Sequence, residues 1–416
     1  MSRLSVCRIL WAGSIVAGGL CLTGCSVEQR MAKVAGGIET TFANARDWEQ
    51  LPLRAISWQQ ALSMVQQNNV ELKSLAFAIA RSEREGLGVY TDMIPGLSYY
   101  GYLTKSINDV RRIDSRDLNS SVNVTFNLPT ITNIPYRVYA AHANTFSAIK
   151  TRELSERDII SKLYAEIRNR EIELKKRALQ KQRPGLDEQD RMLAASAERL
   201  ADSSYWKNVA ELLGDYSARW YILPESLPRV KWSRYLPKLN KLSSLSVERF
   251  AIQLEQSRLR KYGVALKYLP TINTNLYSPS LFSSTGGTYE GAFLDGEDTN
   301  LNLSASYSID TQLDTWNEYM DSKDDYEITR RKVEASIISH KHKLIQLKRS
   351  VQDYLSWRSY MHKRIEYIEA SPVMTATDRL TNEETLFSMK SELLNQEAAS
   401  VESETAVILE YGIGAD

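Results

Sequence analysis

The chain has 416 residues, a formal net charge of +1 and only 11 Pro and 19 Gly. Lys and Arg are scattered among Asp and Glu, which argues against a nucleic-acid-binding surface. So little Pro and Gly favours long uninterrupted elements over a loop-rich scaffold. All three Cys fall within the first 25 residues, which excludes a disulfide framework in the rest of the chain.

The N-terminus has the layout of a cleaved export signal. Arg3 and Arg8 provide a basic flank for the apolar run of residues 9–22, which is too short to be a convincing membrane-spanning helix. The run ends in the string LTGC at residues 22–25, and this string resembles the lipobox of bacterial lipoproteins. An ordinary secretory signal with a chance Cys at its end is the alternative.

The lipobox resemblance implies that Cys25 is acylated, with palmitate as an expected lipid, and becomes the first mature residue once residues 1–24 are removed. Ser26 follows in place of Asp, and in such lipoproteins this points to the outer membrane. Cys7 and Cys21 would leave with the signal. The mature chain would then have no Cys pair for a disulfide or a thiolate metal site.

Residues 25–55 show no lasting periodicity and are interpreted as a lipidated tether. Ser57 and Gln60 then stand in a capping-box pattern, and apolar residues recur beyond them at three- and four-residue steps. The pattern predicts one long helix over residues 58–94, which Pro95-Gly96 ends.

Two strands are predicted next, at residues 97–103 and 121–128. The second alternates apolar residues with Asn and Thr, which gives it one apolar face and one uncharged polar face. A tilted strand of about ten residues can cross a bilayer. The same pattern also suits a half-buried strand of a soluble sandwich.

A long helical hairpin is predicted after the second strand. Helical spacing from residue 136 to about 182 gives a rod of roughly 70 Å. Pro184-Gly185 turns the chain, and a helix returns over residues 188–213. This predicts an antiparallel coiled-coil hairpin, although a solvated hairpin that binds a partner has the same pattern.

The same order of elements then repeats. The second set is a helix over residues 246–268, strands at 271–277 and 300–310, a long helix over about 316–368, a turn at Pro372 and a last helix. Internal duplication is a more specific signal than any single strand. It predicts two structural repeats, residues 56–213 and 246–412, joined by a connector at 214–245.

The four predicted strands cannot close a barrel within one chain. An open sheet edge is not tolerated in hydrocarbon, so strands that cross a membrane must share a barrel with other copies. The polar faces would then line a watery lumen, and their lack of charge suits a conduit without strong selectivity. The candidate lumen-facing residues are Asn123, Thr125, Asn302, Ser304 and Ser306.

Three features together resemble the TolC-like outer membrane efflux proteins. They are the duplicated order, Ile94-Pro95 and Leu269-Pro270 before the first strand of each pair, and the string ELLG at residues 211–214. The resemblance covers nearly the whole mature chain, from about Ser57 to Gly412. It implies a mainly α-helical fold with a small membrane β part: long antiparallel coiled-coil helices forming an α-barrel, plus four transmembrane β-strands per chain, completed in a homotrimer as a 12-stranded barrel.

In that family the protein is a passive exit duct of a tripartite efflux or secretion system. The resemblance therefore implies a lipid-anchored location in the outer membrane of a Gram-negative type of bacterium, extending into the periplasm. It also implies two protein partners, a periplasmic adaptor and an inner-membrane transporter that supplies the energy.

The tips of the two hairpins form the periplasmic gate and the adaptor-docking site in such proteins. The corresponding residues of the first tip here are Gly185, Leu186, Asp187 and Asp190. At the second tip Asp378 and Arg379 occupy the equivalent place, while Thr381 stands where a further Asp is common. For Asp378, a solvated position at the start of a helix is the alternative to a pore role.

Patterns for catalysis and cofactor binding are absent from the sequence. There is no phosphate-binding Gly loop or nucleophile elbow, so we predict no enzyme activity, cofactor or metal site. The four His lie in the predicted rods, at positions 142, 340, 342 and 362. The competing hypothesis is a lipid-anchored periplasmic coiled-coil scaffold or adaptor without a membrane pore, in which other protein surfaces would cover the apolar strand residues.

Overall fold

The computed structural model describes residues 30–40, 50–91, 96–103, 118–127, 133–181, 202–268, 271–278, 300–306, 309–371 and 376–413. The chain divides into two units, which are described separately: residues 1–54 with 216–221, and residues 55–215 with 222–416. Among the helices of the described residues, none is both long and apolar enough to cross a membrane.

The smaller unit contains a helix at residues 30–40 and contributes most of the residues of a two-stranded sheet. Strand β1 (Leu53–Ile56) pairs with β4 (Arg219–Ile222) in this sheet. The Arg219 backbone donates to the Pro52 carbonyl at 2.9 Å, and its Nε donates to the Leu51 carbonyl at 2.9 Å. These bonds hold the segment after the tether against the connector strand.

Two helices, α2 (Trp58–Asn68) and α3 (Val70–Thr91), occupy the region predicted as one helix. The capping box at the start is confirmed, because the Ser57 backbone donates to Gln60 Oε1 at 2.8 Å and the Gln60 backbone donates to Ser57 Oγ at 3.3 Å. The uninterrupted helix is wrong. Asn69 has φ −58° and ψ 125°, which breaks the helical path, and its Oδ1 accepts from the Leu72 backbone at 3.2 Å as an N-cap.

An Asn69→Ala variant should lose stability through two contacts at once. The N-cap of α3 is worth about 1 kcal/mol, and the buried Asn69 Nδ2 also donates to the Leu212 carbonyl at 2.9 Å. Chemical denaturation of the detergent-purified protein should show a lower midpoint. Gln67→Ala is the control, because Gln67 is exposed and its side chain donates to the exposed Ser63 at 3.1 Å. Equal midpoints for the two variants would contradict the role given to Asn69.

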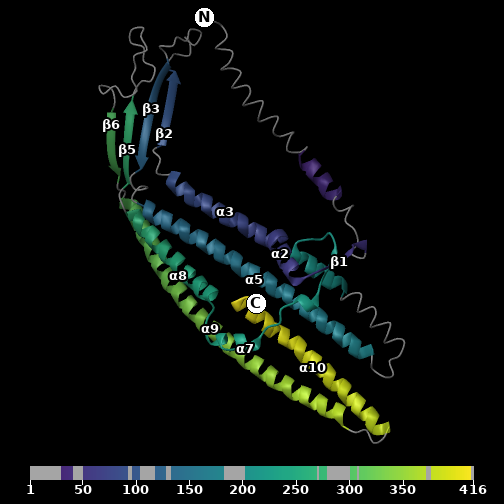
Figure 1. Cartoon of the computed structure of the whole chain (residues 1–416). Coiled ribbons are helices and arrows are strands. Elements are labelled where there is room, and N and C mark those ends of the chain that lie inside the picture. The colour runs from purple at the N-terminus through teal and green to yellow at the C-terminus, as the bar shows by residue number, and fades with distance from the viewer. Residues whose placement is uncertain are drawn as a thin grey trace. The chain divides into compact units, whose positions relative to one another are not determined.

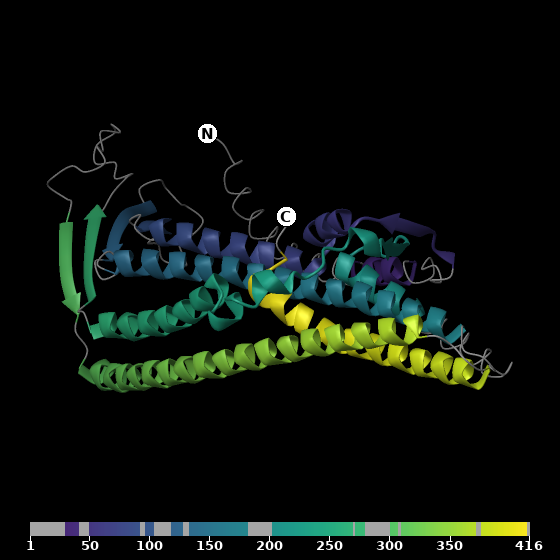
Figure 2. The same ribbon diagram turned by 60° about the horizontal axis from the view of Figure 1, so that its bottom comes forward.

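Long helices make up most of the larger unit. The principal ones are α5 (Ile134–Lys181), α8 (Ser244–Ala265), α9 (Ile309–Ala370) and α10 (Ala376–Tyr411). Figures 1 and 2 show α3 beside α5 and α8 beside α9, and α10 packs on both α5 and α9. Residues 202–213 form a further helix. The long rods expected from helical spacing are therefore confirmed.

Four antiparallel strands form one sheet in the order β2-β3-β5-β6. Their bounds are Gly96–Leu103 for β2, Leu118–Asn127 for β3, Thr271–Ser278 for β5 and Asn300–Ser306 for β6. The sheet lies at the ends of α3, α5, α8 and α9 (Figure 1). The last strand is shorter than predicted, since α9 already begins at Ile309. The alternation of Ser with apolar residues continues past this point and could not mark where the backbone turns.

The connector between the repeats folds as short elements: β4, a 3-10 turn η4 (Pro224–Ser226), α7 (Trp232–Tyr235) and a 3-10 turn η5 (Lys238–Asn240). After α8, a third such turn η6 (Leu266–Tyr268) precedes β5. Tyr235 and Leu239 are buried with Leu344 of α9 and Val407 of α10. Frequent Pro keeps these elements short, and the buried side chains of Tyr235 and Leu239 pack α7 and η5 against α9 and α10.

Candidate functional site

The pairing register of the sheet aligns the polar positions that the sequence predicted on separate strands. Residues directly opposite one another share a face of an antiparallel sheet. Two polar rows join Thr125 to Asn275 and Asn302, and Asn127 to Asn273 and Ser304. One apolar row joins Val124 to Leu276 and Leu301. The two strand pairs therefore combine into one sheet with a common polar face.

The other candidate lumen residues belong to the same alternation. Asn123 lies opposite Ser98 on β2 and Tyr277 on β5, and Ser306 lies opposite Thr271. The register thus places all five predicted positions on the same face of the sheet. Whether this face lines a pore stays a prediction.

The predicted anchor and first hairpin tip lie outside the described residues. They are Cys25, Gly185, Leu186, Asp187 and Asp190. The second tip is partly described: Asp378 and Arg379 are exposed in the first turn of α10, where an acidic residue favours the helix dipole. Arg379 Nε lies 3.2 Å from Glu383 Oε1, an exposed pair of small energetic weight. A gating role for these residues remains a prediction.

A buried charged cluster joins α5 to α10. The guanidinium of Arg168 is only 5% exposed and contacts three carboxylates: Glu171 at 2.7 Å, Glu397 at 2.9 Å and Glu404 at 3.3 Å. Tyr164 donates to Glu404 Oε2 at 2.8 Å. Burial lowers the pKa of the Arg168 guanidinium, but the three carboxylates outweigh burial and hold this pKa above its usual value. Arg168 therefore stays charged between the two helices.

The sequence contains charged residues on the apolar stripes of α5 and α10, which the search for apolar spacing passed over. Glu397 and Glu404 stand seven residues apart, on the same stripe of α10 as the apolar Val401 and Ile408. Arg168 likewise follows Ile167 within the apolar part of α5. Two acidic residues and one basic residue on facing apolar stripes indicate a buried ion-pair network, which sequence reasoning missed.

A second polar junction joins α8, α9 and α10 around Glu410. Its carboxylate accepts from the Ser243 backbone and from Ser246 Oγ, each at 3.0 Å, and lies 3.0 Å from His340 Nε2. Burial raises the pKa of the Glu410 carboxyl, but the hydrogen bonds from Ser243 and Ser246 and the nearby His340 ring outweigh burial and hold this pKa below its usual value. The Glu410 backbone carbonyl accepts from Arg157 of α5 at 2.9 Å.

A Glu410→Gln variant should be less stable than the native protein at neutral pH, and the difference should shrink in acid. Because the folded-state pKa lies below the unfolded value of about 4.3, the contribution of Glu410 is full above that value and is lost as pH falls through the folded-state pKa. Guanidinium denaturation of both proteins at about pH 7 and about pH 3 measures this. Glu402→Gln, at an exposed position of α10, is the control.

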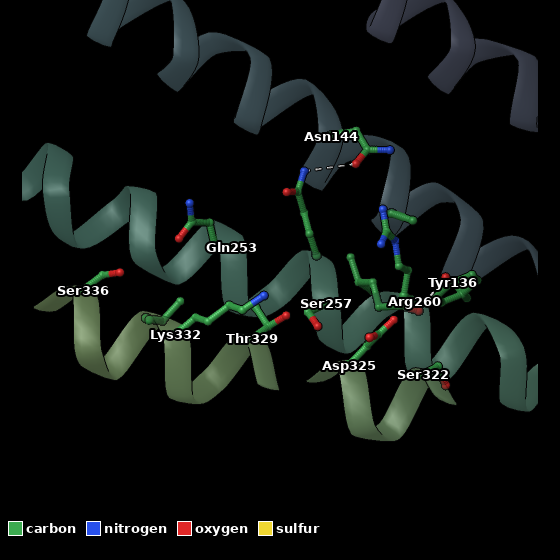
Figure 3. A pocket seen from close by; sticks show the side chains of 14 residues that line it. Tyr136, Asn144, Gln253, Ser257, Arg260, Ser322, Asp325, Thr329, Lys332 and Ser336 are labelled. Atoms are coloured by element: carbon green, nitrogen blue, oxygen red, sulfur yellow. Dashed lines mark hydrogen bonds between the residues drawn. The ribbon is translucent and has the colours of Figure 1, made fainter. Parts of the chain in front are cut away.

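An open polar groove of about 790 Å³ runs between α5, α8 and α9. Figure 3 shows its lining of amides, hydroxyls and charged groups, with Gln256 Nε2 donating to Asn144 Oδ1 at 3.4 Å. Tyr136 at one end donates from its hydroxyl to the Leu259 carbonyl at 2.7 Å. In the part of the chain that the structure describes, no three His, Cys, Asp or Glu residues converge as metal ligands.

This order of elements, a helix, two paired strands and long helices occurring twice around one sheet, is the TolC-like fold of bacterial outer membrane channels. The outer membrane protein VceC from Vibrio cholerae matches with a TM-score of 0.58 and 14% identity, over 86% of this chain and 96% of that chain. The Campylobacter jejuni outer membrane channel CmeC matches with a TM-score of 0.53 and 13% identity, over 85% of each chain. The resemblance inferred from the sequence is confirmed at the level of the fold.

A membrane protein from Pseudomonas aeruginosa also matches, with a TM-score of 0.53 and 12% identity over 88% of this chain and 95% of that chain. No protein-family model and no curated protein sequence matches the chain. The chain thus shares this fold with proteins to which it is only 12–14% identical in sequence.

Proposed function

We propose that this protein is the outer membrane exit duct of a tripartite efflux or secretion system. It passively conducts substrates that an inner-membrane transporter and a periplasmic adaptor deliver. The observation that carries the proposal is the shared register of the polar rows on one open four-stranded sheet at the ends of long helices. An open sheet with one polar and one apolar face suits completion by other copies into a closed wall around water.

Three copies contribute twelve strands, and the long helices continue the duct into the periplasm as an α-barrel. Acylation of Cys25 anchors each N-terminus in the outer membrane. Gly185, Leu186, Asp187 and Asp190 at the first hairpin tip, with Asp378 and Arg379 at the second, form the periplasmic gate and adaptor contact. A wide, water-filled duct does not distinguish one substrate from another, so the partner transporter selects what passes.

Adjacent substitutions on β6 test whether the apolar face meets lipid. Leu303 lies in the row of Phe126 and Thr274, whereas Ser304 lies in a polar row. Leu303→Arg should prevent assembly in the membrane, since Arg on a lipid-facing strand position near the midplane costs about 2–4 kcal/mol per chain. Ser304→Arg places the same charge toward water and should assemble normally. Membrane fractionation followed by native gel electrophoresis measures both.

The proposal would be contradicted if Ser304→Arg impaired membrane assembly as much as Leu303→Arg, or more. A Leu303→Arg substitution that merely damages a protein core, with no membrane assembly to lose, would instead favour the lipid-anchored periplasmic scaffold. In that alternative other protein surfaces cover the apolar rows, and no pore forms.

A further inference from the structure

The helix at residues 30–40 carries an apolar stripe that no described part of its own unit covers. Met31, Val34 and Ile38 lie on one face, because steps of three and four residues return to the same side of a helix. Their exposed fractions are 66%, 58% and 65%. Lys33 and Thr40 fall on the opposite face. Three large apolar side chains aligned in this way in water indicate a surface that meets an apolar environment.

The position of this stripe in the chain indicates what that environment is. Five residue steps separate Arg30 from Cys25, so an extended segment can span at most about 18 Å between them. An acylated Cys25 therefore keeps the start of the helix close to the headgroup layer. Arg30 and Lys33 outnumber the single carboxylate of Glu39, which suits a surface containing anionic lipid.

The backbone of the helix also leaves room for this placement. At Gly36 and Gly37 an added side-chain carbon would meet no atom within 4 Å, so the small-residue side of the helix is open as well. Thr40 Oγ1 donates to the Gly36 carbonyl at 2.6 Å and satisfies one acceptor in the last turn. A helix of this kind can lie flat with its apolar face in the interface and its backbone bonds intact.

We propose that residues 30–40 form an amphipathic helix that lies on the surface of the outer membrane, with Met31, Val34 and Ile38 inserted between lipids. The inference rests on the proposed lipid anchor at Cys25. The acyl chains hold the protein to the membrane, and the helix fixes the direction in which the tether leaves it. The occupant of the apolar stripe is therefore lipid and not a second protein surface.

Neighbouring cysteines on opposite faces of the helix test this in the acylated, full-length protein. The mature chain has no other free thiol, since Cys7 and Cys21 leave with the signal. Val34→Cys, Ile38→Cys and the control Lys33→Cys are labelled with nitrobenzoxadiazole. Each protein is reconstituted into vesicles of phosphatidylethanolamine and phosphatidylglycerol that contain a spin-labelled phosphatidylcholine quencher. Labels at positions 34 and 38 should be blue-shifted and quenched, and the label at position 33 should be neither.

Equal quenching at positions 33 and 34 would overturn the proposal. A label at position 34 that is blue-shifted but not quenched by lipid would also overturn it, because protein and not lipid would then cover the stripe. The mass of the N-terminal peptide and the conductance of the same vesicles report on the anchor and the duct separately. An acylated, conducting protein with equal quenching therefore contradicts only the membrane-bound helix.

Discussion

A Gly214→Ala variant is expected to lose about 2–5 kcal/mol of its free energy of unfolding. Gly214 ends the helix at residues 202–213 with φ +69°, and the bonds from its own backbone to Glu211 and from Asp215 to Ala210 form a Schellman motif. The left-handed conformation costs a residue with a side chain about 1–2 kcal/mol. A side-chain carbon here would also stand 2.5 Å from the Asn68 carbonyl oxygen.

That second contact makes this glycine different from an ordinary helix end. The break between α2 and α3 packs directly on Gly214, and both contacting groups are backbone, so neither can rotate away. Overpacking of this kind costs about 1–3 kcal/mol in addition. Gly214 is the last residue of the ELLG string. A glycine is required there because the backbone of Asn68 approaches so closely.

Gly412→Ala is the matched control for Gly214→Ala. Gly412 has φ +76°, but a side-chain carbon there would meet no atom within 4 Å. It should therefore show the conformational loss of about 1–2 kcal/mol alone. Denaturation of both detergent-purified variants separates the two contributions. Equal losses at the two positions would show that the approach of Asn68 to Gly214 has no energetic weight.

An Arg168→Met variant is expected to lose about 3–5 kcal/mol, because it removes the cation that the buried Glu404 carboxylate contacts. Glu404 is 10% exposed, so water solvates it poorly once the guanidinium is gone, whereas Glu171 keeps its pairs with Lys175 at 2.9 Å and Arg229 at 2.7 Å. The loss should fall mainly on the contact between α5 and α10. Guanidinium denaturation measures the total, and hydrogen exchange at the two helices shows where protection is lost.

The exposed pair Arg81 and Glu85 provides the comparison for Arg168. Their side chains are 77% and 63% exposed, so Arg81→Met should change stability by no more than about 1 kcal/mol. An additional Glu404→Gln substitution should restore part of the stability of Arg168→Met, since it removes one of the stranded charges. A double variant that is less stable than Arg168→Met would contradict the cluster's electrostatic role.

The sequence predicted the long helices well because their apolar residues keep helical spacing over many turns, as in α5 and α10. The Ser57 capping box was equally readable, since its two partners are three residues apart. Asn69 was missed although its cap bond to Leu72 is just as local, because the apolar spacing continues across it and its second contact, with the Leu212 carbonyl, lies 143 residues away. Arg168 and Glu410 were missed because partners such as Glu397 and Glu404 on α10 and His340 on α9 come from other helices, and a period along one helix does not reveal such contacts.

For the strands too, some features were predictable from the sequence and others were not. Alternation identified the strands predicted at residues 121–128 and 300–310, and it also predicted which of their positions are polar. The alignment of those positions into rows depends on the pairing of β3 with β5, which joins the two repeats and has no trace in either repeat alone. Likewise, alternation could not place the end of β6, since Ser and apolar residues continue to alternate into the start of α9.

The most direct measurement of the proposed function is the conductance of the purified protein in planar lipid bilayers. We expect the detergent-purified protein to be a trimer and to insert with discrete, stable conductance steps, which Leu303→Arg abolishes and Ser304→Arg retains. A protein that stays monomeric and soluble without detergent, and that gives no conductance, would contradict the exit duct.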